Sequence, residues 1–522
     1  MARLFNFMNI LLFLITICIC LAFLNVEHFY PWSTYDTEKY IFYASSLLFI
    51  YFIVNNKKSI KIDTNIIFLI LLFLCSLFSY QLYSFQQYFY IFNFYLLNLI
   101  ILCIILKNHF NDSDKLLITV MVALVISGVL SSVLSIYQWL DFEKGSFWLY
   151  EPNGSRLSAN LAQPNHLATL LLLSLLSCLY FFEKLKTFYL LMFIPLLLFS
   201  LVLTQSRSAW LALLIIMVLI FFKWKKIEVS LRIIILSLIP IYIGMACLLS
   251  ENNQVHIVGR VNGGFERLEI WKDFFSIYPY VGFWGSGWKN IEYYQFQYAN
   301  NFPSYISSYH NLLLDLIVIF GFLGGIFFIY VFLNLLRIFL KIDRGSDLIV
   351  FLMLYILINH ALLEFPLFYG YFLFVFCILY FYLGSRFPLI SVKFNIGNSF
   401  FSILVVIVIV LSFLYTQSFE KNRSNYRAAF LGYCVPKLGG DILFDEFNNQ
   451  AFINCKENIS LKNISYFESG LLSRPSSNNI LKLIYVYHQL GEYKKRDQLL
   501  KKYNSRYLPQ YNLSDVLKMK FY

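Results

Sequence analysis

The chain has 522 residues and is 59% hydrophobic and 20% aromatic, whereas an ordinary soluble domain contains roughly 45–50% apolar residues. This composition excludes a soluble globular protein and indicates a polytopic membrane protein. The net charge of +12 does not indicate a nucleic-acid partner, because the Lys and Arg residues stand in short clusters between apolar runs and in the tail.

Apolar runs long enough to cross about 30 Å of hydrocarbon recur from one end of the chain to the other. The alternating pattern of a membrane β-barrel is not visible in them, so we expect an all-α polytopic membrane protein with about 13 transmembrane helices. The first run is longer than the core of a signal peptide and lacks a small-residue cleavage pattern, which predicts a retained span. The expected spans are 4–24, 39–54, 64–80, 88–106, 116–139, 166–182, 187–204, 209–222, 231–250, 311–336, 347–364, 368–385 and 399–416.

The positive charges predict the orientation of these spans. Lys and Arg gather in every second connection, for example at Lys223, Lys225 and Lys226, while the short connections between them are nearly bare. Because cytoplasmic loops of membrane proteins are enriched in Lys and Arg, we expect the N-terminus inside and, with an odd number of spans, the C-terminus outside. The outer connections then include 25–38, 140–165, 205–208, the long loop 251–310 and the short turn near His360.

The tail differs in composition from the rest of the chain, which predicts two domains: a membrane domain over 1–416, including the loop 251–310, and an outer helical domain over 417–522. The stretch 478–507 alternates apolar and charged residues at helical spacing, as a paired-helix repeat does. Cys434 and Cys455 both lie in this segment. On an oxidising outer face they form either a disulfide or two unpaired thiols.

Two outer connections carry dense polar motifs. The first, "HFYPWSTYDTE" (28–38), is either an ordered interfacial turn or an aromatic belt segment. The second, "EPNGSRLSANLAQPNH" (151–166), ends where a long apolar run begins; Pro164 stops that helix from extending upstream, and Asn165 could cap it. Polar groups at the mouth of a span are costly unless they line a hydrated cavity. The candidate site residues of this motif are Asn160, Gln163, Asn165 and His166.

Two arginines stand in further outer motifs. Arg207, in "TQSRSAW", lies at the outer end of a span, where arginines often extend their charge to the interface instead of binding a ligand. Arg267, in "GGFERLEIWKD", precedes Trp271 by one helical turn. Guanidinium groups bind phosphate through two parallel hydrogen bonds and keep their charge, so both arginines are candidate phosphate ligands.

Two histidines complete the set. His310 and Asn311, in "SSYHNLLLDLIVIFGFLGG", open the next membrane helix. His360 and Glu364, in "NHALLEFPLFYGYF", are four residues apart and should share one helical face, where they form a buried structural pair, a proton path or a substrate clamp. A histidine can accept a hydroxyl proton near pH 7. Together with two arginines it suits the attack of an alcohol on a lipid-anchored glycosyl diphosphate.

Motifs for other chemistries are weak or missing from the sequence. Asp141 and Glu143 make a single acidic pair, which is poor evidence for a metal site, and the sequence contains no HExxH, CxxC, EF-hand or phosphate-binding glycine motif. We therefore expect neither a metal nor a cofactor.

Six of these motifs, in order over about 25–385, resemble the bacterial protein O-oligosaccharyltransferases of the PglL type, which belong to the O-antigen ligase superfamily. They are "NLAQPNHLATLL", "TQSRSAW", "ERLEIWKD" with "GFWGSGW", "SSYHNLLLDLIVIFGFLGG", "NHALLEFPLFYGYFL" and "HFYPWSTYDTE". One departure is that Trp284 and Trp288 stand in a loop that is usually glycine-rich with smaller residues.

The resemblance implies a C-type glycosyltransferase in the bacterial inner membrane with its active site facing the periplasm. Its donor would be a preassembled glycan on undecaprenyl diphosphate, and its acceptors Ser or Thr of periplasmic proteins such as pilins. The implied base is His310, the implied diphosphate ligands are Arg207 and Arg267, and the implied reaction is metal-independent and inverting. The candidate substrate-binding residues are Asn160, Gln163, Asn165, His166, Asn311, His360 and Glu364.

Two alternatives remain open. An O-antigen ligase or polymerase acting on lipid-linked glycans shares Arg207, Arg267 and His310 with this family but does not need the "NLAQPNH" segment. A transporter would use His360 and Glu364 as a proton relay; transporters usually show inverted repeats with broken helices near the midplane, and no internal repeat is apparent.

Overall fold

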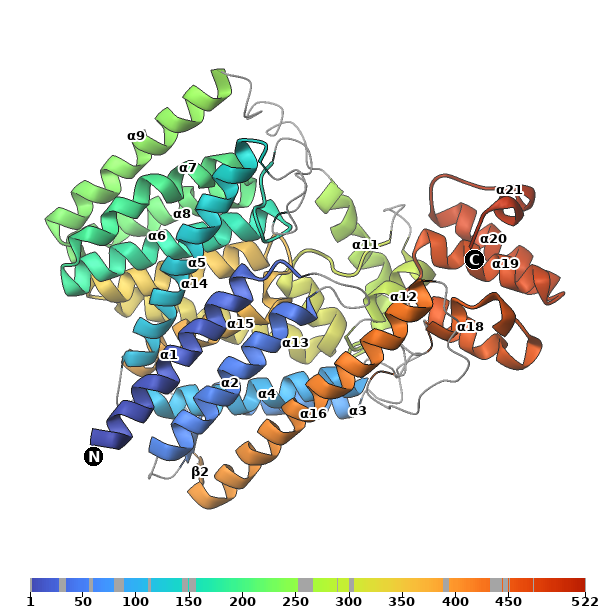
Figure 1. The fold of residues 1–522 in the computed structure, drawn as a ribbon, viewed down its shortest axis with the longest axis horizontal. Coiled ribbons are helices and arrows are strands. Elements are labelled where there is room, and N and C mark those ends of the chain that lie inside the picture. The colour runs from blue at the N-terminus through green and yellow to red at the C-terminus, as the bar shows by residue number, and fades with distance from the viewer. Residues whose placement is uncertain are drawn as a thin grey trace. The chain divides into compact units, whose positions relative to one another are not determined.

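A computed structural model gives the fold of the chain (Figure 1). The chain forms two compact units: unit 1 comprises Met1–Thr64, Ile101–Gly264 and Val331–Val405, and unit 2 comprises Asn65–Ile100, Phe265–Tyr330 and Val406–Tyr522. The residues that the structure describes are 2–27, 34–55, 60–78, 89–110, 114–142, 149, 156–251, 266–288, 290–299, 305–387, 394–431, 444, 449, 451–472 and 474–521.

Each of the expected spans falls on an apolar helix. In the described parts of the chain, eight helices are long and apolar enough to cross a membrane, and five shorter apolar helices have 10–17 residues. The helical membrane class is therefore confirmed, while the number of crossings and their orientation stay predictions. The apolar helices are α1 (Ala2–Leu24), α2 (Tyr35–Asn55), α3 (Thr64–Phe78), α4 (Phe89–His109), α5 (Lys115–Trp139), α6 (Pro164–Leu185), the pair η3 (Phe188–Phe193) and α7 (Ile194–Thr204), α8 (Arg207–Phe222), α9 (Val229–Glu251), α13 (Leu312–Lys341), α14 (Gly345–Ala361), α15 (Gly370–Arg386) and α16 (Asn398–Phe430).

Shorter elements connect these helices and build the tail. The strands β1 and β2 form an antiparallel pair in which Ile60 lies opposite Ile396. The other elements are β1 (Ile60–Ile62), η4 (Trp224–Lys226), α11 (Glu266–Val281), α12 (Asn290–Tyr298), η5 (Pro366–Phe368), β2 (Phe394–Ile396), η6 (Lys456–Asn458), η7 (Leu461–Asn463), α18 (Ile464–Leu472), α19 (Ser477–Gln489), α20 (Tyr493–Arg506) and α21 (Leu513–Lys518).

Helix α6 is the centre of unit 1. Residues 165–182 of this helix are all buried, and the helix packs against α5, α7, α8, α9 and α14. A helix that is apolar all round suits this central place, because each of its faces meets another helix. The polar residues at its N-terminal end are thereby held inside a packed helical bundle.

The predicted inner ends of unit 1 are joined by ion pairs. The Asp114 carboxylate accepts hydrogen bonds from Lys184 Nζ at 2.6 Å and from an Arg386 guanidinium nitrogen at 3.0 Å. Burial raises the pKa of Asp114, but the hydrogen bond and charge of Lys184 and the charge of Arg386 outweigh it, so the pKa lies below its usual value. These contacts tie the start of α5 to the ends of α6 and α15.

In unit 2, helix α13 is broken at Gly321, where the backbone has φ 63° and ψ −145°. The loop with the sequence "GFWGSGW" (282–288) lies against this break, and the Phe322 N–H donates to Phe283 O at 3.0 Å. A Cβ at Gly321 would lie 1.9 Å from Phe283 O, so only glycine fits there. Trp288 stacks on Phe92 with ring centroids 5.6 Å apart, which accounts for one of the two unexpected tryptophans.

The tail forms short helices, drawn in red in Figure 1, and α19 packs against both α18 and α20. Residues 477–506 thus form the helix pair that the periodicity predicts. The expected domain border at residue 416 falls inside α16, which continues to Phe430, and the division into two domains stays a prediction. Cys455 is buried, and Cys434 lies outside the described residues, so their pairing also stays a prediction.

Candidate functional site

Asn165 is the hub of a buried polar network in unit 1. Its Oδ1 accepts hydrogen bonds from an Arg156 guanidinium nitrogen at 2.9 Å and from Ser206 Oγ at 2.8 Å. Its Nδ2 donates to Glu364 Oε1 at 3.2 Å. The expected capping role of Asn165 is wrong, because Gln163 is the N-cap of α6 and Pro164 its first residue. The amide of Asn165 instead joins the ends of three helical segments.

Two buried histidines lie beside this hub. His166 is 2% exposed, its Nδ1 lies 3.3 Å from Tyr371 Oη, and its ring meets the His360 ring edge-on at 5.4 Å. His360 Nδ1 lies 2.7 Å from Thr169 Oγ1. The four candidates Asn165, His166, His360 and Glu364 are therefore brought together, from sequence positions about 200 residues apart.

The shared helical face expected for His360 and Glu364 is not formed, because α14 ends at Ala361. The chain turns there, and the Glu364 N–H still donates to His360 O at 2.8 Å. The turn directs the carboxylate of Glu364 to Asn165. This contact favours a structural or substrate-holding pair over a proton path along one helix.

The remaining candidates of this unit have different surroundings. Asn160 is fully buried; its Nδ2 donates to Phe23 O at 2.7 Å and its Oδ1 accepts from Ser131 Oγ at 2.9 Å, so its amide ties α1 to α5. Gln163 is half-buried, and its backbone carbonyl accepts from the N–H groups of the first turn of α6. Arg207 is half-buried and is the first residue of α8.

Strained backbone surrounds the same motif. Ala159, Ala162 and Gln205 have positive φ angles of 49°, 58° and 47°. Non-glycine residues adopt this conformation at a cost, which persists where the surrounding structure imposes it and is concentrated at functional sites. The strain agrees with a site built around Asn160–His166 and the start of α8.

We expect Asn165→Ala to lower the stability of the chain by about 1–3 kcal/mol, because it removes three hydrogen bonds, two of which involve the buried side chains of Ser206 and Glu364. Thermal unfolding of the detergent-solubilised protein measures this change. The matched control is Gln163→Ala, two residues earlier, which removes none of these three hydrogen bonds. An Asn165→Ala protein as stable as Gln163→Ala would contradict the hub.

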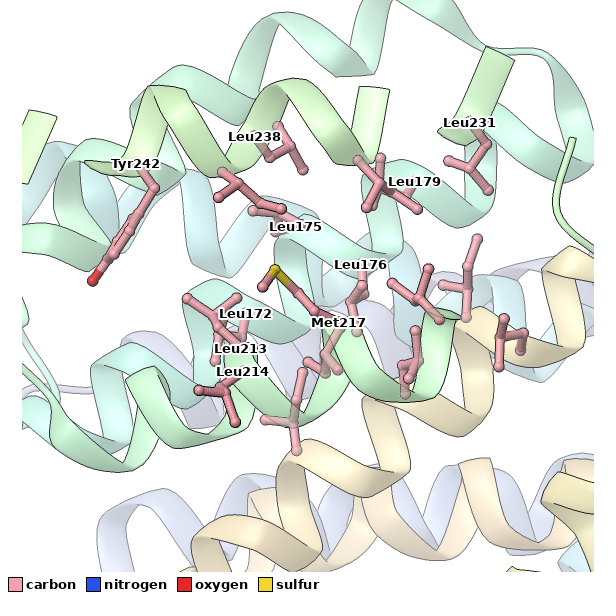
Figure 2. A pocket seen from close by; sticks show the side chains of 18 of the residues that line it. Leu172, Leu175, Leu176, Leu179, Leu213, Leu214, Met217, Leu231, Leu238 and Tyr242 are labelled. Carbon is pink, nitrogen blue, oxygen red and sulfur yellow. The ribbon is translucent and has the colours of Figure 1, made fainter. Parts of the chain in front are cut away.

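An apolar pocket of about 250 Å³ lies between α6, α8, α9 and α14 (Figure 2). Its lining is almost entirely aliphatic; Trp210 and Tyr242 also line it, and Trp210 Nε1 donates to Tyr242 Oη at 2.9 Å. Trp210 follows Arg207 by one turn of α8. A long apolar ligand could therefore lie beneath a charged group bound at Arg207.

In unit 2, His310 occupies a constrained turn. Its φ angle is 52°, and its N–H donates to Ser308 Oγ at 2.9 Å. The Asp315 carboxylate, one turn into α13, accepts from Ser308 Oγ at 2.6 Å and from the Tyr309 N–H at 2.8 Å. Asn311 Oδ1 accepts from the N–H groups of Leu313 and Leu314, so Asn311 caps α13. The imidazole is thus presented from a fixed backbone.

Helix α11 is bonded to the same turn. Trp271 Nε1 donates to Tyr309 O at 2.9 Å, and Arg267, half-buried, lies one helical turn before Trp271 on the same helix. The spacing of "ERLEIW" therefore places Arg267 on the helix that supports His310. Arg267 and His310 thus stand on two segments that this hydrogen bond joins.

Several residues of these networks were not among the sequence candidates, among them Arg156, Ser206 and Asp315. Arg156 stands in a polar loop nine residues before Asn165, where no local pattern distinguishes it from its polar neighbours. Asp315 is recognisable from the sequence, since a single carboxylate inside an apolar span has a high free-energy cost and is usually functional. Asp141 is exposed, while Glu143 and most of the "HFYPWSTYDTE" motif lie outside the described residues.

Comparison with known protein families gives three matches in chain order. Residues 159–182 match a family described as protein glycosylation ligase, and residues 190–329 match O-antigen ligase. Residues 348–519 match a family described as virulence factor membrane-bound polymerase, C-terminal. The last match includes most of the tail, so the similarity to this family extends beyond the membrane helices.

Two curated relatives come from Acinetobacter baylyi. A general O-oligosaccharyltransferase is 28% identical over 385 residues, covering 70% of this chain and 68% of the relative. A ComP-specific O-oligosaccharyltransferase is 30% identical over 259 residues, covering 47% of each chain. The family prediction from the motifs is confirmed by these matches: parts of the chain match the O-antigen ligase and protein glycosylation ligase families, and its curated relatives are O-oligosaccharyltransferases.

Proposed function

We propose that the chain carries out O-linked protein glycosylation, transferring a preassembled oligosaccharide as one block from undecaprenyl diphosphate to Ser or Thr of periplasmic proteins. The observation that carries the proposal is the place of the "NLAQPNH" segment. The protein glycosylation ligase match begins at residue 159, and Asn165 within it is the hub of the buried network. The enzyme lies in the inner membrane with this site facing the periplasm.

The reaction is a single displacement. The acceptor hydroxyl oxygen attacks the anomeric carbon of the first sugar, and its proton passes to a ring nitrogen of His310. The bond between the anomeric carbon and the diphosphate oxygen breaks, and polyprenyl diphosphate leaves with the bonding electrons. Attack from the side opposite the leaving group inverts the anomeric carbon. The constrained turn of His310 supports the role of base, because a base must be held within about 3 Å of the proton that it accepts.

Charge on the leaving diphosphate grows in the transition state, and Arg207 and Arg267 are the residues that we assign to it. Arg207 stands at the N-terminus of α8, where the helix dipole favours an anion. The guanidinium group and the helix end then act on the same ligand.

An aliphatic pocket in unit 1 suits the lipid part of the proposed donor. The aliphatic pocket of Figure 2 begins one helical turn from Arg207, as expected if a polyprenyl chain descends into the membrane from a diphosphate at the surface. Burial of this chain supplies affinity in proportion to its apolar area. The polar end of the donor would be set by the arginines.

The test is co-expression of the chain with a defined undecaprenyl-diphosphate-linked glycan and candidate periplasmic proteins, read by intact-protein mass. We expect at least one acceptor to gain the mass of the whole glycan, and a His310→Asn chain to give none. Loss of the gene should leave lipopolysaccharide banding unchanged. Loss of O-antigen with unaltered protein masses would assign the chain to ligation or polymerisation of lipid-linked glycans instead.

We expect transfer to persist in excess EDTA, because the arginines can supply the charge stabilisation that a metal ion would otherwise give. Transfer rates of the purified protein with and without chelator measure this. If EDTA abolishes transfer and Mg²⁺ or Mn²⁺ restores it, the arginine mechanism is incomplete. Asp141 and Glu143 would then be the first metal ligands to test.

A further inference from the structure

Asp315 is a buried carboxylate inside an apolar helix of unit 2. It is 1% exposed and lies in the first turn of α13, where a charged side chain has a high free-energy cost and needs compensation. Both of its oxygens are used: Oδ2 accepts from Ser308 Oγ at 2.6 Å, and Oδ1 accepts from the Tyr309 N–H at 2.8 Å. The carboxylate thus holds the two residues that directly precede His310.

Capping of α13 does not explain these contacts. Asn311 precedes the helix, and its Oδ1 already accepts from the N–H groups of Leu313 and Leu314. An acidic residue in the first turn also interacts favourably with the helix dipole, but that effect requires no particular partner. Asp315 instead reaches back beyond the cap to the Tyr309 N–H, six residues earlier. Its contacts therefore stabilise the turn that leads into the helix.

Ser308 extends this constraint to the backbone of His310. A serine hydroxyl has one proton to donate and two lone pairs that can accept. Because the Ser308 proton is directed to Asp315, a lone pair is left to accept from the His310 N–H at 2.9 Å. A continuous chain of hydrogen bonds therefore runs from the carboxylate to His310. Ser308 is 2% exposed, so water has little access to compete for these bonds.

The backbone of His310 needs such support. Its φ angle of 52° is unfavourable for a residue other than glycine and persists only where neighbouring contacts impose it. The bonds from Asp315 hold the turn on the side of α13. On the side of α11, Trp271 Nε1 donates to Tyr309 O at 2.9 Å. His310 itself is only half-buried, so the fixed turn ends in a side chain that remains partly exposed.

We infer that Asp315 is a positioning residue for glycan transfer: through two buried hydrogen bonds it fixes the turn from which the His310 ring reaches the acceptor hydroxyl. The inference rests on the proposed function, in which His310 is the base. It has two consequences. The carboxylate acts through the geometry of its hydrogen bonds, and it acts on the reaction only through His310.

The first test measures transfer kinetics of the full chain, per amount of membrane-inserted protein. We expect Asp315→Ala to lower kcat about 10- to 100-fold, since a displacement of about 1 Å can have that effect, with little change in KM for the donor. Asp315→Asn should recover most of the lost rate, because its amide oxygen can accept from the Tyr309 N–H while its NH2 group donates to Ser308 Oγ. The matched control is Asp347→Ala, which removes a similarly buried carboxylate from the first turn of α14 and should keep the kcat of wild type.

The second test separates positioning from a purely structural role. In a His310→Asn chain the base is absent, so adding Asp315→Ala should not lower the residual transfer further. The effects of residues that act as a unit are not additive. A purely structural role would change transfer by the same factor in both backgrounds.

Three results would overturn the inference: wild-type kcat for Asp315→Ala, Asp315→Asn no faster than Asp315→Ala, or the same fold loss with and without His310. If Asp315→Ala does not accumulate, Ser308→Ala replaces it, because it breaks the same chain of hydrogen bonds. Wild-type kcat for Ser308→Ala would then overturn the inference. Failure of the proposed function is distinct from all of these, because the wild-type chain would then transfer no glycan to protein.

Discussion

His310→Ala should reduce glycan transfer by about 10²- to 10⁴-fold, the usual effect of removing a general base, while the chain still inserts into the membrane. In the proposed function His310 contributes its ring to the reaction, whereas the turn is held by Ser308 and Asp315. Initial transfer rates with a purified lipid-linked glycan and an acceptor protein measure the effect. The amount of inserted protein must be determined in parallel.

The control for this experiment uses the unusual backbone of the turn. His310 has a φ of 52°, a conformation that alanine adopts poorly but asparagine tolerates. His310→Asn therefore keeps the turn without the base and should be as inactive as His310→Ala. Wild-type transfer by His310→Asn would exclude His310 as the base and leave His166 or Glu364 to be tested.

Arg267→Lys should lower transfer by about 10- to 100-fold, because a lysine ammonium cannot reproduce two parallel hydrogen bonds to a diphosphate. The loss should appear in kcat, since the charge on the leaving group develops in the transition state. Rates over a range of donor concentrations separate kcat from KM.

Two further substitutions make the result specific. Lys272→Ala removes an exposed charge from the same helix, α11, and should leave transfer unchanged. Arg207→Lys should have a milder effect than Arg267→Lys if part of the role of Arg207 is to reach the interface. Full activity of Arg267→Ala would exclude the diphosphate clamp.

Sequence alone determined the membrane class, the place of each apolar helix and the family, because these depend on local properties. Hydropathy is summed over one segment at a time, and a motif is a short run of residues. The spacing in "ERLEIW" already placed Arg267 one turn from Trp271, and Asn311 opened α13 as expected.

Only the tertiary structure decided what these residues contact. The role of Asn165 depends on Arg156, Ser206 and Glu364, and the last of these is 199 residues away; no local rule distinguishes such a hub from a helix cap. The end of α14 at Ala361 likewise follows from the turn that brings Glu364 to Asn165.

The break in α13 and the packing of the tail likewise depend on segments that are distant in the sequence. Gly321 leaves helical geometry because the backbone of 282–288 occupies the space beside it, and "FGFLGG" reads as an ordinary apolar stretch without that neighbour. Phe296 stacks on Tyr507, and Arg506 donates to Gln295 O; the two residues of each pair are 211 positions apart in the chain. Whether a side chain is buried against a distant segment depends on which segments pack together. The free energy gained by that packing depends on the whole folded chain.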